Sequence, residues 1–338
     1  MPGYRRWRTL ALLMLAATTV GCGGGALHAP RPTNRAIFAA APPAEPRLEL
    51  RIEAGQLTTT AASPDERAWI DQASRAIGAY YGHFPVPRAS LLVERIPGSG
   101  VRWARTFARS GAFIRVGVGD QTTASEFASD WILTHEFVHL ALPQLADEHD
   151  WLQEGAATYV EPIARAQAGQ LSPQRVWGEF VREMPRGLPA DGDRGLDFTP
   201  TWARTYWGGA LFCLVADVKI RSRTANRVGL QQALRSILEN GGTLEHRWSV
   251  RDTLAAGDRA TGVDVLIQMY EQWRAAPVQI DLDNLWRQLG IEANGREVVL
   301  RDDAPLAHIR RAITAPAAEA RSLAFAGRDH TAWREQDR

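Results

Sequence analysis

The sequence predicts an α+β fold in which a β-rich part precedes an α-helical region. Three observations support this. Segments with strand-like patterns all lie before residue 120 of the 338-residue chain. Two helices that carry polar motifs come next, and helical patterns continue from about residue 172 onward. A chain of this length can form one large domain or two modest ones.

The charge of the chain is nearly balanced. Its net charge is +1 at pH 7, and 23% of its residues are charged. The chain therefore has neither the excess of positive charge that nucleic-acid binding requires nor an acidic tail, and we expect no nucleic-acid partner.

The N-terminus has the layout of a secretory signal. Three arginines precede an apolar run, residues 10–20, that is too short to span a bilayer. Residues 19–22 resemble the lipobox of a bacterial lipoprotein, which is cleaved before its cysteine. The expected cleavage point therefore falls before Cys22, and residues 1–21 are the expected signal peptide. The alternative is a plain signal peptide with an incidental cysteine.

Residues 22–46 are rich in Gly, Ala and Pro and predict a tether without a core of its own. With Cys22 acylated, as with palmitate, the protein is expected at the cell envelope, anchored to the membrane and facing the periplasm or the exterior. Cys213 then has no partner for a disulfide and is expected to be a small buried side chain. We expect a monomer.

The folded part is expected to begin with a half-buried strand at residues 47–54, where apolar and charged residues alternate. A capping box at residues 63–66 starts a helix that runs to about Tyr81. Further strands are expected at residues 89–96, 101–107 and 112–118. The last two can pair through a turn at residues 109–111.

A second capping box, residues 123–126, is expected to start the first motif helix, which Pro143 would end. Asp150 can cap the next helix, residues 151–167, and Pro162 is expected to kink it or break it in two.

Later helical patterns lie at residues 173–183, 204–220, 228–239, 263–275 and 281–289. The folded chain therefore divides into an α+β lobe, residues 47–170, and a helical lobe, residues 171–290. A partly disordered C-terminal extension, residues 291–338, completes it.

The apolar segment 131–142 contains a glutamate and two histidines. His135 and His139 are four residues apart and therefore project from one face of a helix, where both can reach one Zn²⁺. Glu136 is placed to act as a general base without binding the metal. Because a catalytic zinc site takes three protein ligands, Glu154 on the next helix is the candidate third.

The motif HExxH at residues 135–139, followed by W-L-x-E-G-x-A-x-Y at residues 151–159, resembles the gluzincin zinc metallopeptidases, and the second motif is closest to their aminopeptidase-N-like branch. The resemblance implies a thermolysin-like catalytic domain, with a small mixed sheet and the two motif helices, followed by a helical region. It also implies hydrolysis of peptide bonds by a metal-activated water. The residues that it assigns are the zinc ligands His135, His139 and Glu154 and the catalytic base Glu136.

In the same family a downstream tyrosine is followed by glycine and an apolar helix. Residues 206–215 match that pattern, which implies that Tyr206 donates a hydrogen bond to the oxyanion. The chain departs from the aminopeptidases in two ways: the spacing from His139 to Glu154 is shorter, and residues 111–121 lack the glutamate of their Gly-Ala-Met-Glu-Asn segment. The strand in residues 111–121 could still pair with an extended peptide substrate.

Two other functions stay open. A cell-surface binding or assembly lipoprotein could use the zinc site only as a structural element, and related sites can open epoxides.

Several nearby residues are expected to have supporting roles. His149 is interpreted as a surface loop residue, and Trp131, Trp151 and Tyr159 as packing residues. Glu161 or Asp217 could hold the histidine ligands from behind.

Overall fold

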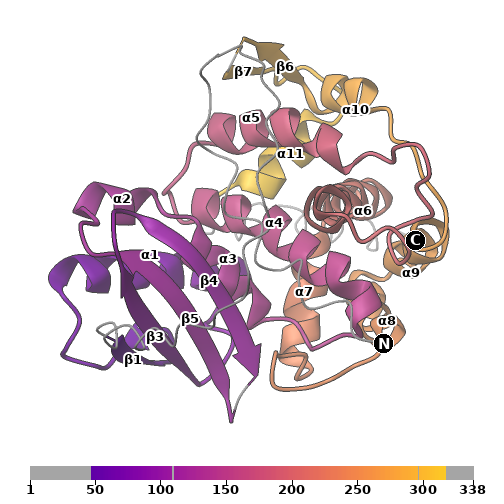
Figure 1. Ribbon diagram of the computed structural model, residues 1–338. Coiled ribbons are helices and arrows are strands. Elements are labelled where there is room, and N and C mark those ends of the chain that lie inside the picture. The colour runs from indigo at the N-terminus through magenta and orange to yellow at the C-terminus, as the bar shows by residue number, and fades with distance from the viewer. Residues whose placement is uncertain (1–46, 109, 296, 317–338) are drawn as a thin grey trace, which may run out of the picture.

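The computed structural model describes residues 47–108, 110–295 and 297–316. The expected signal peptide, Cys22 and the tether lie outside these ranges. Within them, no helix is both long and apolar enough to cross a lipid bilayer. Figure 1 shows a twisted sheet on one side of the molecule and helices on the other, with α4 between them.

The sheet has five strands in the order β2-β1-β3-β5-β4. Their bounds are β1 (Arg47–Glu53), β2 (Gln56–Leu57), β3 (Arg88–Ile96), β4 (Val101–Ala108) and β5 (Ala112–Gly119). Strand β5 pairs in parallel with β3 and antiparallel with β4, so the sheet is mixed. The expectation that the strand in residues 111–121 offers an edge to a peptide is wrong: β5 has a neighbour on both sides, and β4 is the strand at this edge of the sheet.

Helix α1 (Pro64–Tyr81) confirms the first capping box. The Ser63 hydroxyl accepts the Glu66 N–H at 3.2 Å, and the Glu66 carboxylate accepts the Ser63 N–H at 2.9 Å. Gly82 ends the helix at φ 94°, a left-handed conformation that glycine adopts without strain. Phe84, in the connection between α1 and β3, meets Phe137 of the motif helix α3 edge to face at 5.2 Å.

The second capping box does not start the motif helix. It starts the short helix α2 (Ala124–Ser129), and the histidines lie on a separate helix, α3 (Ile132–His139). The helical conformation is interrupted between them at Asp130. The Asp130 carboxylate accepts hydrogen bonds from the N–H groups of Ile132 and Leu133, each at 3.1 Å. It also accepts the Trp69 indole N–H at 2.8 Å. A new helix therefore starts here, because Asp130 satisfies its first free N–H groups.

Helix α4 (Asp150–Gln167) is the central helix of the molecule, packed against α1, α3 and α6. It is continuous through Pro162, so the helix is not broken in two there. Asp150 is its first residue and not its cap, and His149 at the cap position makes no side-chain cap bond. The motif helix α3 ends at His139, before Pro143 is reached.

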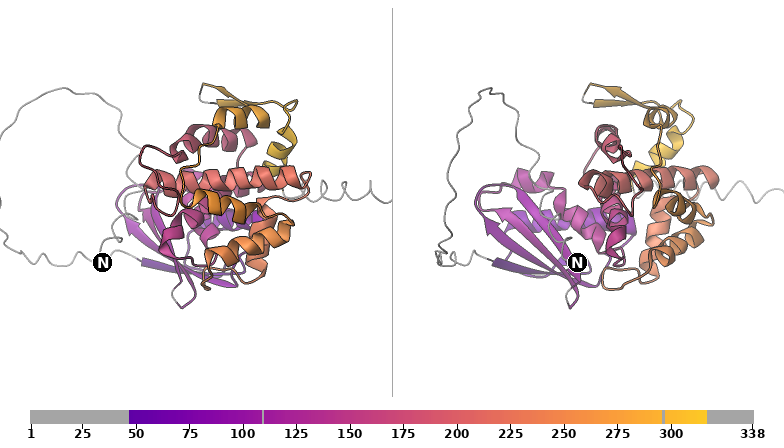
Figure 2. Two further views of the ribbon diagram at one scale, coloured as in Figure 1. Left: turned by 90° about the vertical axis from the view of Figure 1, so that its right-hand side faces the viewer. Right: turned by 45° about the vertical axis from the view of Figure 1, so that its right-hand side comes forward.

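The remaining elements are mostly helical. They are η2 (Asp147–His149), α5 (Pro173–Glu183), η3 (Met184–Gly187), η4 (Arg204–Gly208), α6 (Gly209–Arg223), α7 (Leu230–Glu239), α8 (Val250–Thr261), α9 (Val265–Trp273), α10 (Leu282–Leu289), β6 (Ile291–Asn294), β7 (Glu297–Leu300) and α11 (Ala307–Thr314). The expected helices are present, with the first motif helix divided into α2 and α3, and α8 and α11 are additional. The described part of the expected C-terminal extension, up to residue 316, forms the β6–β7 hairpin, at the top of the molecule in Figure 2, and α11 below it. Residues 317–338 lie outside the described ranges. The division of the chain at residue 170 stays a prediction.

Helices α4 and α6 pack closely because each has a glycine at their contact. A Cβ atom on Gly155 would overlap the backbone of Gly209, and one on Gly209 would overlap the backbone of Trp151. The glycine of the W-L-x-E-G motif is therefore explained by packing. It lets α6 approach the helix turn that carries Glu154.

Candidate metal centre

The two motif histidines share one face of α3. Their rings lie one helix turn apart, with centroids at 5.1 Å and an interplanar angle of 77°. His135 is buried and His139 is partly exposed, so the pair reaches from the interior toward solvent. This is the arrangement that the four-residue spacing predicts.

Glu154 points back from α4 at the same face. Its Oε2 lies 3.3 Å from His135 Nε2 and 3.4 Å from His139 Nε2. A tetrahedral ion at about 2.0–2.1 Å from each ligand atom has adjacent ligand atoms about 3.3 Å apart. The spacing and the donor set, two imidazoles and one carboxylate, therefore fit zinc. Within the described ranges, these three residues are the group whose ligand atoms gather closely enough for a metal, all within 4.8 Å.

The two histidines lower the pKa of the Glu154 carboxyl group. Burial by itself would raise the pKa of this carboxyl group, but the charge of His139 and hydrogen bonds from both histidines outweigh it. The pKa of Glu154 is therefore held well below its usual range, and the side chain is ionised at neutral pH. An ionised carboxylate is the form that binds a divalent cation.

Glu136 is held by a residue of the sheet. The Thr106 hydroxyl on β4 lies 2.6 Å from Glu136 Oε2 and 3.1 Å from the backbone carbonyl oxygen of Glu136. A hydroxyl has one proton to donate, so the shorter contact to the carboxylate is the stronger bond. Because Thr106 and Glu136 are 30 residues apart, no local pattern in the sequence could have shown this bond.

Tyr206 lies beside the histidine pair. Its ring stacks on that of His135 with centroids 6.2 Å apart at 22°. The residue belongs to η4, one turn of π-helix at the start of α6, and such turns are frequent at functional sites. Arg204 in the same turn is buried, with its Nε 2.7 Å from Asp193 Oδ2 and a hydrogen bond from Nη1 to the Gly187 carbonyl oxygen. The turn is thus fixed to the preceding loop.

A cavity of about 330 Å³ brings these groups together. It is lined by both histidines, both glutamates, Tyr206 and the consecutive residues 104–108 of β4. The candidate ligands, the candidate base and the edge strand therefore share one solvent-accessible space.

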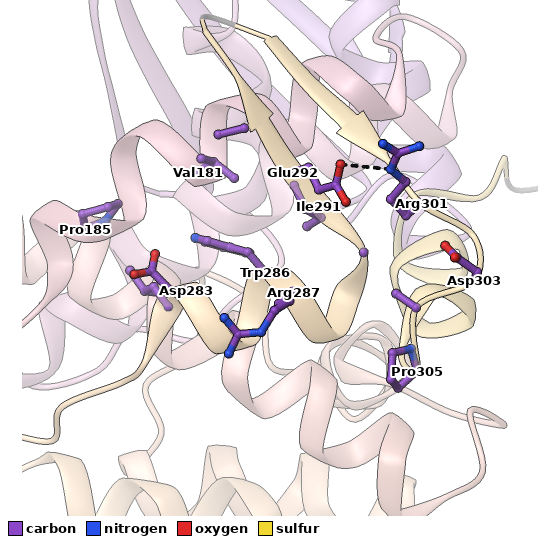
Figure 3. A pocket seen from close by; sticks show the side chains of 14 residues that line it. Val181, Pro185, Asp283, Trp286, Arg287, Ile291, Glu292, Arg301, Asp303 and Pro305 are labelled. Carbon is purple, nitrogen blue, oxygen red and sulfur yellow. Dashed lines mark hydrogen bonds and ion pairs between the residues drawn. The ribbon is translucent and has the colours of Figure 1, made fainter.

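A larger cavity of about 780 Å³ lies elsewhere, between α5 and the α10–β6 segment (Figure 3). None of the predicted site residues lines it, and its Glu292 carboxylate is paired with Arg301 at 2.9 Å. Size alone does not make it the reactive site.

Two supporting residues differ from expectation. His149 is buried and not a surface residue: its Nδ1 lies 3.1 Å from Asp197 Oδ1, an atom that also accepts the Trp151 indole N–H at 2.8 Å. This cluster fixes the segment that leads into α4. Trp131, expected to pack between the motif helices, is 52% exposed. No pattern in the sequence could have indicated Asp197, because its partners lie 46 and 48 residues away along the chain.

The carboxylates expected behind the histidines bind other groups. Asp217 accepts hydrogen bonds from the Tyr159 hydroxyl at 2.9 Å and from Arg221 Nε at 2.8 Å. Glu161 is paired with Arg165 at 3.0 Å. Both therefore stabilise the helix packing around α4, and the expectation that they hold the metal ligands is wrong. Tyr159 and Cys213 are buried, as expected.

Comparison with known proteins gives a likeness of structure. No protein-family model matches the sequence, and no curated protein matches it. The fold is similar to that of a two-domain M1 zinc metallopeptidase solved with L-arginine, at 18% identity and a TM-score of 0.45, over 70% of this chain and 54% of that one. It is also similar to an M1 zinc metallopeptidase from Deinococcus radiodurans, at 17% identity and a TM-score of 0.43, over 70% of this chain and 53% of that one.

The chain thus spans about half the length of these peptidases. At such identities and TM-scores the likeness concerns the fold and carries no argument about activity. The fold class is α+β, as the sequence predicts.

Proposed function

We propose that this protein is a zinc-dependent peptidase of gluzincin type that acts at the cell envelope. One observation carries the proposal: the ligand atoms of His135, His139 and Glu154 gather within 4.8 Å of one another, with Glu154 Oε2 at the spacing of a tetrahedral zinc site from each histidine, in the cavity that Glu136 also lines. Spacing, donor type and access to solvent are the properties that distinguish a reactive zinc site from a buried ion pair.

The cavity favours catalysis over a purely structural role. Structural zinc sites are closed by a fourth protein ligand, whereas catalytic sites have three and leave one position open. In the described part of the chain the metal-binding group has three members, and they line a cavity of about 330 Å³. A substrate carbonyl therefore has space to approach.

Each residue of the site has a task in peptide hydrolysis. When bound, zinc would supply Lewis acidity and an activated water. Glu136 takes a proton from the attacking water and delivers it to the leaving amine. Thr106 holds the Glu136 carboxylate in one orientation. Tyr206 donates a hydrogen bond to the oxygen on which negative charge develops.

The substrate is expected to lie along β4. This strand pairs with β5 on one side, and its residues 104–108 line the cavity. The outer edge of a strand offers backbone N–H and C=O groups to an extended peptide, which can add as a further strand. Strand β4 thus replaces the strand in residues 111–121 as the candidate substrate edge.

Incubation of the zinc-loaded protein with a mixed peptide library, followed by mass spectrometry of the products, tests the proposal. We expect defined cuts by the wild type. Glu136→Ala should produce none while its zinc content, measured by elemental analysis, stays at one ion per chain. Glu136→Gln is the matched control for shape, since it retains the volume but cannot accept the proton. Turnover by Glu136→Ala equal to that of the wild type would remove the assigned base.

The anchor is a separate part of the proposal. Cys22, which lies outside the described residues, would carry the acyl chain that holds the protein at the membrane. We expect the wild type to incorporate labelled palmitate and to sediment with membranes. Cys22→Ser should do neither. If the two proteins associate with membranes equally, Cys22 does not anchor the protein, and the N-terminus is a plain signal peptide.

A further inference from the structure

The connection between α7 and α8, residues 240–249, forms part of the wall of the candidate metal site (Figure 1 labels both helices). Two of its residues, Leu244 and Arg247, line the cavity of about 330 Å³ that also contains Glu136 and the three candidate ligands. The mechanism of peptide hydrolysis gives Leu244 and Arg247 no task. Arg247 is of interest because it places a guanidinium group in the space where a substrate would lie.

Hydrogen bonds hold the backbone of Arg247 in this place. The Gln144 N–H donates to the carbonyl oxygen of His246 at 2.8 Å, and the Gln144 carbonyl oxygen accepts the Trp248 N–H at 3.2 Å. Gln144 and Arg247 are thus paired in an isolated parallel β-bridge. The Gln144 side chain adds a bond from Nε2 to the carbonyl oxygen of Leu244 at 2.8 Å. The position of Arg247 at the cavity is therefore set by the fold.

The connection touches both α3 and the sheet. The Leu244 N–H donates to the carbonyl oxygen of Leu140, the residue that follows the ligand His139, at 3.3 Å. In the turn between β4 and β5, a Cβ atom on Gly111 would lie 3.6 Å from Glu245 Oε1. The connection therefore joins the end of the metal-binding helix to the end of the edge strand, where a peptide that extends along β4 would approach it.

The Arg247 guanidinium has donors that the protein does not use. A guanidinium carries five N–H donors. Among the described residues, this one contacts a single acceptor, Gln144 Oε1 at 3.4 Å from Nη2, and forms no ion pair with a carboxylate. A contact of that length to a neutral amide is a weak hydrogen bond. Because the side chain is also exposed, most of its donors are available to a ligand in the cavity.

The second arginine of the cavity wall, Arg105, is directed elsewhere. Its Cζ atom lies 5.4 Å from the centre of the Phe107 ring. Side chains alternate between the two faces of a strand, so Arg105 and Phe107 lie on the face opposite to Thr106. Thr106 is the residue that contacts Glu136. Arg247 is therefore the better placed of the two cations to meet a group bound beside Glu136.

Acidic residues of the cavity wall make the place of an anion selective. Glu136, Glu154, Asp147 and Asp150 all line the cavity. Two positive charges of zinc would offset the first two carboxylates, whereas Asp147 and Asp150 would repel an anion close to them. A carboxylate in this space is thus stabilised where a cation meets it, and Arg247 provides that cation.

We propose that Arg247 binds a carboxylate group of the peptide substrate, close to the bond that is cleaved. The inference rests on the proposed function, because it places the substrate carbonyl at the zinc site. A guanidinium binds both oxygens of a carboxylate through two parallel charge-assisted hydrogen bonds, which are roughly twice as strong as neutral ones. An amide offers one oxygen and no charge. Arg247 therefore acts on the choice of substrate, whereas Glu136 and Tyr206 act on the reacting group.

Two pairs of hydroxamates test the proposal without turnover and distinguish the two sources of a carboxylate. All four ligands bind zinc through the hydroxamate, and the members of a pair differ only in one carboxylate or amide. The first pair is the malonyl hydroxamate of alanine as free acid or as amide, which represents a chain terminus. The second is acetyl-glutamyl-alanine hydroxamate and its glutaminyl analogue, which represents an acidic side chain. Calorimetry on the zinc-loaded full chain measures binding.

In the wild type, we expect the acid of at least one pair to bind about tenfold more tightly than its amide, which corresponds to about 1.4 kcal/mol. Arg247→Gln should reduce this ratio to about one, while the affinity for the amide stays within twofold. Arg247→Lys keeps the charge but not the planar fork and should retain a ratio of about three. Arg259→Gln makes the same change of charge at an exposed position of α8 outside the cavity and should leave the ratio unchanged.

The outcomes separate this inference from the proposed function. If the four ligands bind but the wild type prefers neither acid, or if Arg247→Gln keeps the preference, the inference is overturned and the open zinc position is retained. Tighter binding of the amide in both pairs would overturn it as well, because Asp147 and Asp150 would then dominate the field in the cavity. If none of the ligands binds, the open zinc position is absent and both proposals fail.

Discussion

The Thr106 hydroxyl on edge strand β4 donates a hydrogen bond of 2.6 Å to the carboxylate of Glu136 on α3. This bond connects the strand that is expected to bind the substrate with the residue that is expected to move the proton. A bond to an ionised acceptor is stronger than one between neutral groups, so it can hold the Glu136 side chain in one rotamer.

Removal of that hydroxyl should slow the chemical step. We expect Thr106→Val to lower kcat by about 10-fold to 100-fold, since a misplaced base loses its alignment with the reacting atoms. KM and zinc content should change little. Steady-state kinetics on a peptide cut by the wild type measures both parameters. Thr106→Ser retains the hydroxyl and should recover most of the rate, and equal loss in both variants would indicate a packing effect instead.

Removal of the third ligand should weaken zinc binding. For Glu154→Ala we expect the affinity to fall by more than about 100-fold, beyond the roughly 10–100-fold loss that outer partners of a ligand cause. Competition with a chromophoric chelator measures this affinity. Glu148→Ala removes an exposed carboxylate from the preceding segment and should have no effect. Unchanged metal affinity in Glu154→Ala would place the third ligand elsewhere.

Tyr206→Phe should separate oxyanion stabilisation from ring packing. The phenyl ring can keep the stack with His135 and Trp202, but the donor is lost. Loss of one such donor lowers kcat by about 10²–10³-fold in hydrolases. We therefore expect a fall of that size with nearly unchanged KM, in the same peptide assay. A variant as fast as the wild type would show that the hydroxyl does not contact the reacting oxygen.

The α4–α6 contact should be intolerant of a single methyl group. In Gly155→Ala the new Cβ would overlap the backbone of Gly209, which cannot move as a side chain can. We expect the free energy of unfolding to fall by about 3 kcal/mol, at the upper end for overpacking. Urea denaturation measures this. Gly78→Ala in α1 meets no atom within 4 Å and should be neutral or raise stability by up to about 1 kcal/mol.

Glu161 should make stability depend on pH. Burial raises its pKa to about 8 despite the charge of Arg165, whereas an unfolded glutamate titrates near roughly 4.3. The folded state therefore favours the neutral carboxyl. Its contribution to stability is complete below the unfolded pKa and is lost as pH rises to the folded value.

The glutamine side chain in the Glu161→Gln variant cannot ionise. The variant should therefore not lose stability from this position as the pH rises. Between about pH 5 and about pH 8.5, we expect the unfolding free energy of the variant to rise relative to the wild type by more than about 1 kcal/mol. Urea denaturation at both pH values provides the comparison. A constant difference between the two proteins would mean that Glu161 keeps one protonation state throughout.

The sequence by itself determined what depends on residues within one or two helix turns of each other. The capping box at Ser63 correctly set the start of α1, and the four-residue spacing of His135 and His139 placed both on one face. The motif at residues 151–159 identified Glu154 as their partner, which the structure brings within 3.4 Å of each.

Only the tertiary structure decided the relations between distant segments. Strand order makes β4 and not β5 the edge, Thr106 meets Glu136 across 30 residues, and Asp197 draws His149 into the interior. Even the break at Asp130 depends in part on the Trp69 indole, 61 residues away. Capping and helical periodicity act over about four residues and can be read along the chain, whereas strand pairing and burial depend on which segments meet in space.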